Sequence, residues 1–124
     1  MNQAIAIAAG GAVGALLRYW TSLGVHSLLG RSFPYGTLTV NVAGSLLMGL
    51  LFVLFVERLN LGSEWRAAIL IGLLGSFTTF STFSIETFNL MEQGEMLKAL
   101  LNILLSITLC LGAAWLGIIT GRQL

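Results

Sequence analysis

The stretch Gly75-Ser76-Phe77-Thr78-Thr79-Phe80-Ser81-Thr82-Phe83 interrupts an otherwise apolar run of the chain. It begins with a glycine, and five hydroxyl residues follow within seven positions. Its three phenylalanines recur at every third residue, so on a helix they share roughly one face. Just beyond lies Glu86, the only carboxylate that has long apolar segments on both sides. A backbone that glycine loosens, a run of hydroxyls and an acid within an apolar segment together indicate a path for something polar.

The composition of the whole chain indicates that its solvent is lipid. Its 124 residues allow one domain, 1–124, and 56% of them are hydrophobic whereas only 9% are charged. The mean hydropathy is +0.92. Soluble domains average about a quarter charged residues, and a soluble protein this small could not bury so much apolar surface. The net charge of +1 argues against nucleic acid as a partner.

Four segments are long and apolar enough to cross a bilayer, which takes about 20 mostly apolar residues. They cover residues 3–23, 36–56, 66–90 and 97–120. The apolar part of the first, Ala4 to Leu17, is short, so its helix must continue through Arg18 towards Leu23 or beyond. The sequence therefore predicts an all-α integral membrane protein without strands, because an open sheet edge is not tolerated in lipid.

One asparagine stands out in the second segment. Thr37, Asn41 and Ser45 are spaced by four residues and share one helical face. A hydroxyl in a membrane helix usually bonds to its own backbone, which explains Thr37 and Ser45. The amide of Asn41 has two donor hydrogens and an acceptor oxygen, and it cannot satisfy them all locally. It needs a partner helix or an aqueous path, and we favour a functional role over packing.

The basic residues do not give an orientation in the membrane. Four crossings put both termini on one side, and three of the six basic residues lie on each side. Those on the side of the termini are Arg58, Arg66 and Arg122, and those on the other are Arg18, Arg31 and Lys98. Such a tie is either chance, which is common with six charges, or a sign that molecules insert both ways as an antiparallel dimer.

Buried polar side chains are a second argument for a dimer. Asn41, Glu86 and Asn102 would be hard to satisfy within four helices alone. A two-fold symmetric pair is the commonest oligomer.

The lone Cys110 is interpreted as a packed residue and the lone His26 as no metal ligand, because neither has a suitable partner nearby in the sequence.

Three motifs resemble those of the Fluc (CrcB) family of bacterial fluoride channels. They are Gly-Gly-x-x-Gly-Ala-x-x-Arg-Tyr at 10–19, Gly-Thr-Leu-x-Val-Asn-x-x-Gly at 36–44, and Gly-x-x-Gly-Ser-Phe-Thr-Thr-Phe-Ser-Thr-Phe at 72–83. The resemblance covers the whole chain in length, helix count and motif order, although the fourth helix is less distinctive. The residues alone lead to a dimeric membrane protein with a narrow polar path, and only the resemblance leads to fluoride.

The resemblance implies an architecture. Members of the family are dual-topology antiparallel homodimers, with the third helix broken in mid-membrane and two antiparallel pores in each dimer. At the break, backbone carbonyls of both subunits hold a structural Na⁺, and the matching positions here are Gly75 and Thr78. Such a break frees carbonyl groups, whose dipoles suit a hard monovalent cation.

The resemblance also implies roles for side chains along the pore. Phe80 and Phe83 would present ring edges, the positive end of the aromatic quadrupole, to the anion, and Asn41 would donate a hydrogen bond. Arg18 would attract anions at a vestibule. The remaining polar residues of the implied track are Ser81, Thr82, Thr37 and Ser106, with Glu86 near one end.

The function that follows is passive export of fluoride from the cytoplasm through the bacterial cytoplasmic (inner) membrane, and the protein is not expected to be an enzyme. The main alternative is a small dual-topology, proton-coupled cation or drug antiporter. That class needs a carboxylate in its first helix, and Ala4 to Leu17 contains none, so Glu86 would be the only candidate. A non-transporting assembly subunit is a second alternative, but it leaves Asn41 and Asn102 without a purpose.

Overall fold

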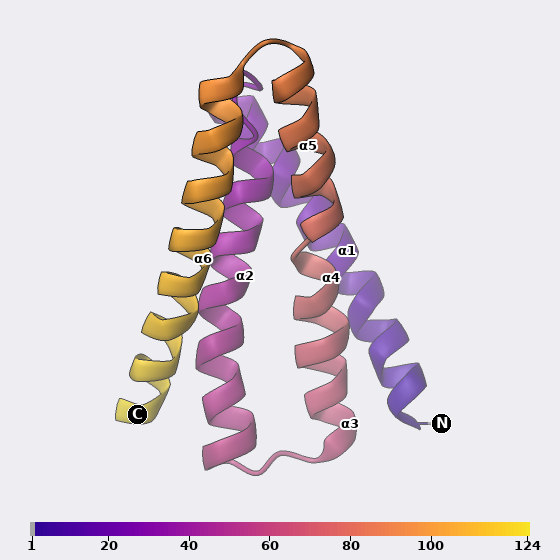
Figure 1. Ribbon diagram of the computed structural model, residues 1–124. Helices are drawn as coiled ribbons and strands as arrows, with labels where there is room; N and C mark the ends of the chain where they lie inside the picture. Colours follow the sequence, from indigo (N-terminus) through magenta and orange to yellow (C-terminus); the bar gives the residue numbers. More distant parts are fainter. Residues whose placement is uncertain (1) are drawn as a thin grey trace.

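The computed structural model describes residues 2–124, and within that range the chain folds into helices joined by short connections (Figure 1). The prediction of an all-α protein with four helical segments able to cross a membrane is confirmed. These segments cover Asn2–Leu29, Tyr35–Arg58, Ser63–Glu92 and Met96–Gln123. Both termini lie at the same end of the molecule, as four crossings require (Figure 1).

Several helices make up the middle two crossings. The first and last crossings are single helices, α1 (Asn2–Leu29) and α6 (Met96–Gln123). The second crossing is α2 (Tyr35–Phe52) followed by the π-helical η1 (Val53–Arg58). The third runs through α3 (Ser63–Arg66), the π-helical η2 (Ala67–Leu74), α4 (Gly75–Phe77) and α5 (Phe80–Glu92).

The first helix is longer than the segment 3–23 expected from hydropathy, and it ends at Leu29. Gly24 does not stop it, because the chain remains helical through that glycine. The helix ends where Gly30 takes a φ of +85°, which glycine tolerates, and the amide of Gly30 donates to the carbonyl of His26 at 2.8 Å. The residues from Gly24 to Leu29 therefore belong to the helix, and the left-handed glycine that follows them ends it.

The helices pack as two pairs, α2 with α6 and α1 with η2. Glycines on these surfaces allow the backbones to touch. A side chain at Gly10 would collide with the carbonyl of Ala68, and one at Gly117 would collide with the carbonyl of Leu46. The two glycine pairs, at 10 and 14 and at 117 and 121, therefore form helix-packing surfaces.

An extended dipeptide separates α4 from α5 within the third crossing, as Figure 1 shows. Thr78 has a ψ of 156°, and Thr79 has φ and ψ of −152° and 122°. The hydroxyl of Thr79 then caps α5 by accepting a hydrogen bond from the amide of Thr82 at 3.3 Å. The hydroxyl of Thr79 therefore fixes the residue at which α5 begins.

Candidate functional site

Asn41 joins α2 to the extended dipeptide through both ends of its amide. Its Nδ2 donates to the carbonyl of Thr79 at 3.0 Å, and its Oδ1 accepts from the amide of Thr79 at 2.8 Å. The expectation that Asn41 would be hard to satisfy within one chain is therefore wrong for Oδ1 and one N–H, because the broken segment of the same chain supplies their partner. One N–H of Nδ2 remains beyond these two bonds.

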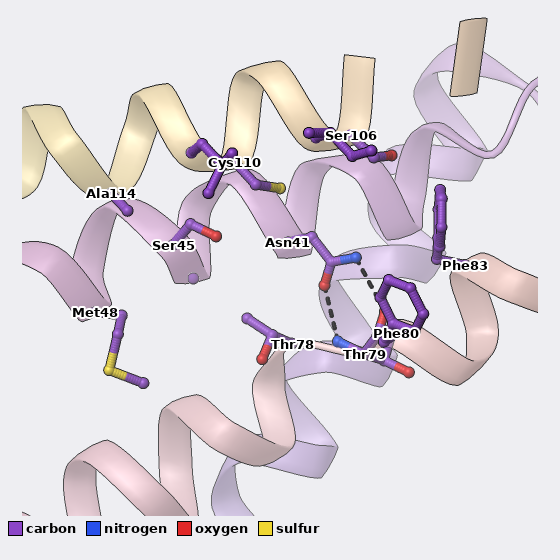
Figure 2. Close-up of a pocket in the computed structure, with 13 residues that line it drawn as sticks. Asn41, Ser45, Met48, Thr78, Thr79, Phe80, Phe83, Ser106, Cys110 and Ala114 are labelled. Atoms are coloured by element: carbon purple, nitrogen blue, oxygen red, sulfur yellow. Dashed lines mark hydrogen bonds between the residues drawn. The ribbon is translucent and has the colours of Figure 1, made fainter. Parts of the chain in front are cut away.

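A pocket of about 430 Å³ lies beside this pair, and Figure 2 shows the side chains around it. Helices α2, α5 and α6 and the extended dipeptide form its wall. The thirteen lining residues are Asn41, Gly44, Ser45, Met48, Thr78, Thr79, Phe80, Phe83, Ser106, Ile107, Cys110, Leu111 and Ala114. None of them is charged. A ligand in this pocket would therefore meet only dipoles, ring edges and apolar atoms.

Phe80 and Phe83 of α5 stand next to each other at this pocket (Figure 2). Their ring centroids are 5.2 Å apart and the rings are tilted by 46°. Phe83 is 9% exposed, whereas Phe80 is 77% exposed on the isolated chain. One ring is thus fixed in the core of the chain, and the other is presented outward beside the pocket.

The structure brings together five of the residues singled out in the sequence, namely Asn41, Thr78, Phe80, Phe83 and Ser106. The other predicted site residues lie outside this wall: Thr37, Ser81, Thr82, Glu86, Gly75 and Arg18. Thr37 is buried in α2, and Ser81 is exposed on α5. The hydroxyl of Thr82 accepts a hydrogen bond from that of Thr79 at 3.1 Å.

Arg18 reaches the broken segment. Its Nε donates to the carbonyl of Ser76 at 3.2 Å, in a half-buried position. Ser76 belongs to α4, whose last carbonyls lose their helical donors where the helix stops. A cation at a helix C-terminus also interacts favourably with the helix dipole. Arg18 therefore stabilises the end of α4 through this contact.

A buried polar network links α6 to the backbone carbonyl of Phe83. Asn102 of α6 donates to the hydroxyl of Thr87 at 2.9 Å, and Thr87 donates to the carbonyl of Phe83 at 2.7 Å. The expectation that Asn102 would be hard to satisfy within one chain is therefore also wrong. Glu86 differs, because its Oε1 is shielded from solvent and has no hydrogen-bond partner within residues 2–124.

The sequence analysis did not assign Ser45, Thr87 or Cys110 to a site. Ser45 and Cys110 line the pocket, and each follows a predicted site residue by four positions, Asn41 and Ser106 respectively. Helical spacing could therefore have found both of them. Cys110 was interpreted as a packing residue only. Nothing in the sequence indicates Thr87, because its hydrogen bond with Asn102 exists only where α6 packs against α5.

The break also changes the partners of backbone carbonyls. In a continuous helix the amide of Thr79 would bond to the carbonyl of Gly75, and here it donates to Asn41 instead. The amide of Thr82, which would bond to the carbonyl of Thr78, donates to the hydroxyl of Thr79. The carbonyls of Gly75 and Thr78 thus lose the amides that a continuous helix would give them. Within residues 2–124 no three His, Cys, Asp or Glu side chains are grouped as metal ligands.

Comparison with known proteins gives a consistent result. Residues 5–118 match the family described as CrcB-like protein, Camphor Resistance (CrcB). Proteins of Methylococcus capsulatus, Coxiella burnetii and Geobacter sulfurreducens named "Fluoride-specific ion channel FluC" are similar to this chain, at 57%, 54% and 50% identity.

The matches to these relatives differ in how much of each protein they cover. The first covers all of this chain but 55% of the Methylococcus protein, so the chain spans about half the length of that relative. The second covers 90% of both proteins, and the third covers 100% of both. The resemblance seen in the three motifs is confirmed. On the match over residues 5–118 and on these identities, the chain belongs to the CrcB family.

Proposed function

We propose that this multi-pass membrane protein is a fluoride-selective ion channel, and not an enzyme, that lets fluoride leave the cytoplasm passively. The relatives in Coxiella and Geobacter that match over nearly their whole length carry the name of a fluoride-specific channel. The observation that carries the proposal for this chain is the uncharged pocket beside Asn41, lined by donors and phenylalanine rings.

The chemistry of the pocket suits a small anion that must pass through. Asn41 keeps one N–H free after bonding to Thr79, and Ser45 adds a hydroxyl donor, whereas the hydroxyl of Ser106 donates to Oδ1 of Asn102 at 3.5 Å. Ring edges of Phe80 and Phe83 carry the positive end of the quadrupole. Such donors replace water around an anion without a fixed positive charge that would trap it. Ser81, Thr82, Thr37 and Glu86 extend this path along the helices in the proposal.

The membrane potential supplies the driving force. Moving one charge through about 100 mV is worth about 2.3 kcal/mol, which supports a gradient of roughly fifty-fold. A cytoplasm that is negative inside therefore expels fluoride without ATP. We place the channel in the bacterial cytoplasmic (inner) membrane, where this potential exists.

The channel is proposed to be an antiparallel, dual-topology homodimer with two antiparallel pores and the break of the third helix at mid-membrane depth. Phe80 is 77% exposed on the isolated chain, which leaves one wall of the pocket for a second subunit to complete. The equal number of basic residues on the two sides supports insertion in both orientations. The extended dipeptide lies midway along the Ser63–Glu92 crossing.

A structural Na⁺ at the two-fold axis fits the same break. The carbonyls of Gly75 and Thr78 have lost the amides that would bond to them in a continuous helix. Two such carbonyls from each subunit would give a hard monovalent cation the oxygen ligands it prefers. When bound, the ion would neutralise carbonyl dipoles that face one another. Arg18, which bonds to Ser76, holds the neighbouring carbonyl and can also draw anions to a vestibule.

A proton-coupled antiporter is not favoured. Helix α1 (Asn2–Leu29) contains no Asp or Glu, and an antiporter of that class exchanges protons on a carboxylate there. The other carboxylates of the four crossings lie at or next to the ends of their segments, so Glu86 is the candidate that could replace it. It lies in the second half of the third crossing, at the middle of α5.

The test is fluoride efflux from liposomes that contain the purified protein. A K⁺ ionophore clears the charge, and chloride-loaded vesicles are the control for selectivity. We expect rapid fluoride release and no chloride release. Absence of fluoride release from a preparation shown to be dimeric would contradict the proposal, and a transport assay with Glu86→Gln would then test the antiporter.

A further inference from the structure

Thr87 and Asn102 form a buried polar pair that the proposed conduction path does not use. Thr87 is 6% exposed and Asn102 is 2% exposed, and neither side chain lines the pocket at Asn41. Burying an amide in an apolar helix is costly unless the amide is hydrogen-bonded. An apolar side chain would pack α5 against α6 without this cost, so the pair needs an explanation beyond packing.

The hydroxyl of Thr87 is used twice. It accepts a hydrogen bond from Nδ2 of Asn102 at 2.9 Å, and it donates its own hydrogen to the carbonyl of Phe83 at 2.7 Å. A hydroxyl can do both at once because it combines one donor hydrogen with acceptor lone pairs. Within residues 2–124, the bond from Asn102 is the one side-chain hydrogen bond between α5 and α6.

This network reaches the pocket at Asn41 on both helices. Phe83, one turn before Thr87 on α5, lines the pocket. Ser106, one turn after Asn102 on α6, also lines it, and its hydroxyl donates to Oδ1 of Asn102 at 3.5 Å, a long bond. The Thr87–Asn102 bond therefore links the wall of the pocket that α5 forms to the wall that α6 forms.

The place of α5 in the fold gives this bond its importance. Helix α5 lies outside the two main helix pairs of the subunit, α2 with α6 and α1 with η2. Its start is held through Thr79, which bonds to Asn41, and its end leads into α6 through a short turn at residues 93–95. Between these two ends a hydrogen bond fixes direction as well as distance, which apolar contact does not. The bond from Asn102 can therefore set the rotation of α5 about its own axis.

We infer that Thr87 and Asn102 are positioning residues, whose hydrogen bond holds the ring of Phe83 where the pocket at Asn41 accepts fluoride. This inference rests on the proposed channel function. Neither residue touches the anion. A site built from a ring edge and an amide N–H needs such support, because several weak donors must converge on one small ion.

Loss of the bond has a specific consequence for conduction. Helix α5 would then occupy the conducting position for only a fraction of the time, and the apparent affinity for fluoride would fall by that fraction. A saturating fluoride concentration would draw the helix back into place. The net contribution of one hydrogen bond changes such an equilibrium by roughly two- to tenfold. A defect in folding would instead lower the number of channels without changing how each one depends on fluoride.

The experiment is single-channel recording of fluoride current in planar bilayers over a range of fluoride concentrations, because such a recording samples folded channels only. In Thr87→Val the half-saturating fluoride concentration should rise roughly two- to tenfold, while the unit current at saturation is unchanged. Thr87→Ser keeps both hydrogen bonds and should restore the unmodified value. The matched control is Thr120→Val, at an exposed threonine of α6 whose hydroxyl donates to the carbonyl of Leu116 at 2.8 Å within the same helix.

A double variant separates positioning from stability. Thr87→Val alone leaves the amide of Asn102 without its acceptor and should lower the melting temperature. Adding Asn102→Leu replaces both partners by apolar groups, which is nearly neutral for stability when the shapes are similar. We expect this double variant to melt close to the unmodified protein and to keep the raised half-saturating concentration.

The inference would be overturned by an unchanged half-saturating concentration in the double variant, because the effect of Thr87→Val would then follow stability alone. A lower unit current at saturation with an unchanged half-saturating concentration would also overturn it, as would an equal shift in Thr120→Val. The channel proposal would stand in each of these cases. No fluoride current from the unmodified protein would instead contradict the channel itself.

Discussion

At the scale of single residues, Asn41 uses one part of its amide in the fold and keeps another part unbonded. Its Oδ1 and one N–H hold the extended dipeptide through Thr79, and in the proposed channel the other N–H would donate to the anion. Phe80 and Phe83 also differ in their surroundings. Phe83 is buried and its backbone carbonyl accepts a hydrogen bond from Thr87, whereas Phe80 is exposed on the isolated chain.

Asn41→Asp should reduce fluoride efflux at least tenfold and also lower the melting temperature in detergent. A carboxylate cannot donate to the carbonyl of Thr79, and leaving such a group unpaired costs about 1–3 kcal/mol. It also adds a negative charge to an anion path. Liposome efflux and thermal unfolding measure the two effects. Ser45→Ala, which removes a hydroxyl of the same pocket without a bond to the dipeptide, is the control for stability. Normal efflux with Asp at this position would show that Asn41 does not touch the anion.

Phe80→Ile should abolish efflux and leave the folded protein intact. The ring is 77% exposed on the isolated chain, so its loss removes little from the core of that chain, while the aliphatic replacement has no positive ring edge. The measurement is fluoride efflux at equal amounts of dimeric protein. Phe88→Ile on the same helix is a matched control, because Phe88 is 60% exposed and does not line the pocket. Equal efflux from the two variants would remove the phenylalanines from the mechanism.

At the scale of elements, the α4–α5 break is positioned by α2 as well as by its own sequence. Besides Asn41, α2 offers Gly44, where a side chain would collide with the Cγ2 of Thr78. The methyl group of Thr78 therefore lies directly on the backbone of α2. The same face of one helix thus supplies both the polar contact and the close approach that hold the dipeptide.

Gly44→Ala should destabilise the protein by about 1–3 kcal/mol, as overpacking does, and Thr78→Ser should recover part of this loss by removing the methyl group. Thermal unfolding of the two single variants and the double variant gives the coupling between the two positions. Gly112→Ala is the matched control, because no atom lies within 4 Å of a Cβ at that glycine. Additive effects of the two changes would show that the contact does not exist in the folded protein.

At the scale of the whole molecule, two helix pairs, α2 with α6 and α1 with η2, form the subunit and leave Phe80 uncovered. Both termini lie at one end, and the basic residues are divided equally between the ends. A subunit of this kind has no preferred orientation under the positive-inside rule. In the antiparallel dimer that we propose, such a balance would let each chain insert in either orientation.

Added positive charge at one end of the chain should force a single orientation in the membrane and should therefore abolish fluoride conduction. Co-expression with a variant that carries the added charge at the other end should restore conduction. Asn2→Lys with Gln123→Lys charges the end that carries the termini. Leu28→Lys with Met96→Lys charges the other end, at positions 85% and 59% exposed. We expect each double variant to be inactive when expressed alone and the two to conduct when expressed together, as measured by cellular fluoride resistance. Full activity of either double variant by itself would contradict the dual-topology dimer.

The sequence by itself determined that the chain lies in lipid, how many times it crosses the membrane, and the chemistry of the site. Long apolar runs can satisfy their backbone in lipid only as helices, so composition and length fixed the four crossings. Asn41 is identified because an amide is conspicuous in an apolar segment, whereas Phe80, Phe83 and Ser106 are identified through the resemblance to the CrcB family. The end of the first helix was less well determined, because hydropathy does not indicate which of Gly24 and Gly30 adopts a positive φ.

Only the tertiary structure decided which polar groups satisfy one another. Asn41 meets Thr79 across 38 residues of chain, and Asn102 meets Thr87 across 15, and neither pairing is visible in local spacing. The same holds for Arg18, which was expected at a vestibule and reaches the carbonyl of Ser76. Local periodicity reports which face of a helix a residue occupies, but the partner depends on which helix packs against that face. That choice is made by close backbone contacts at glycines, which are a property of the assembled bundle.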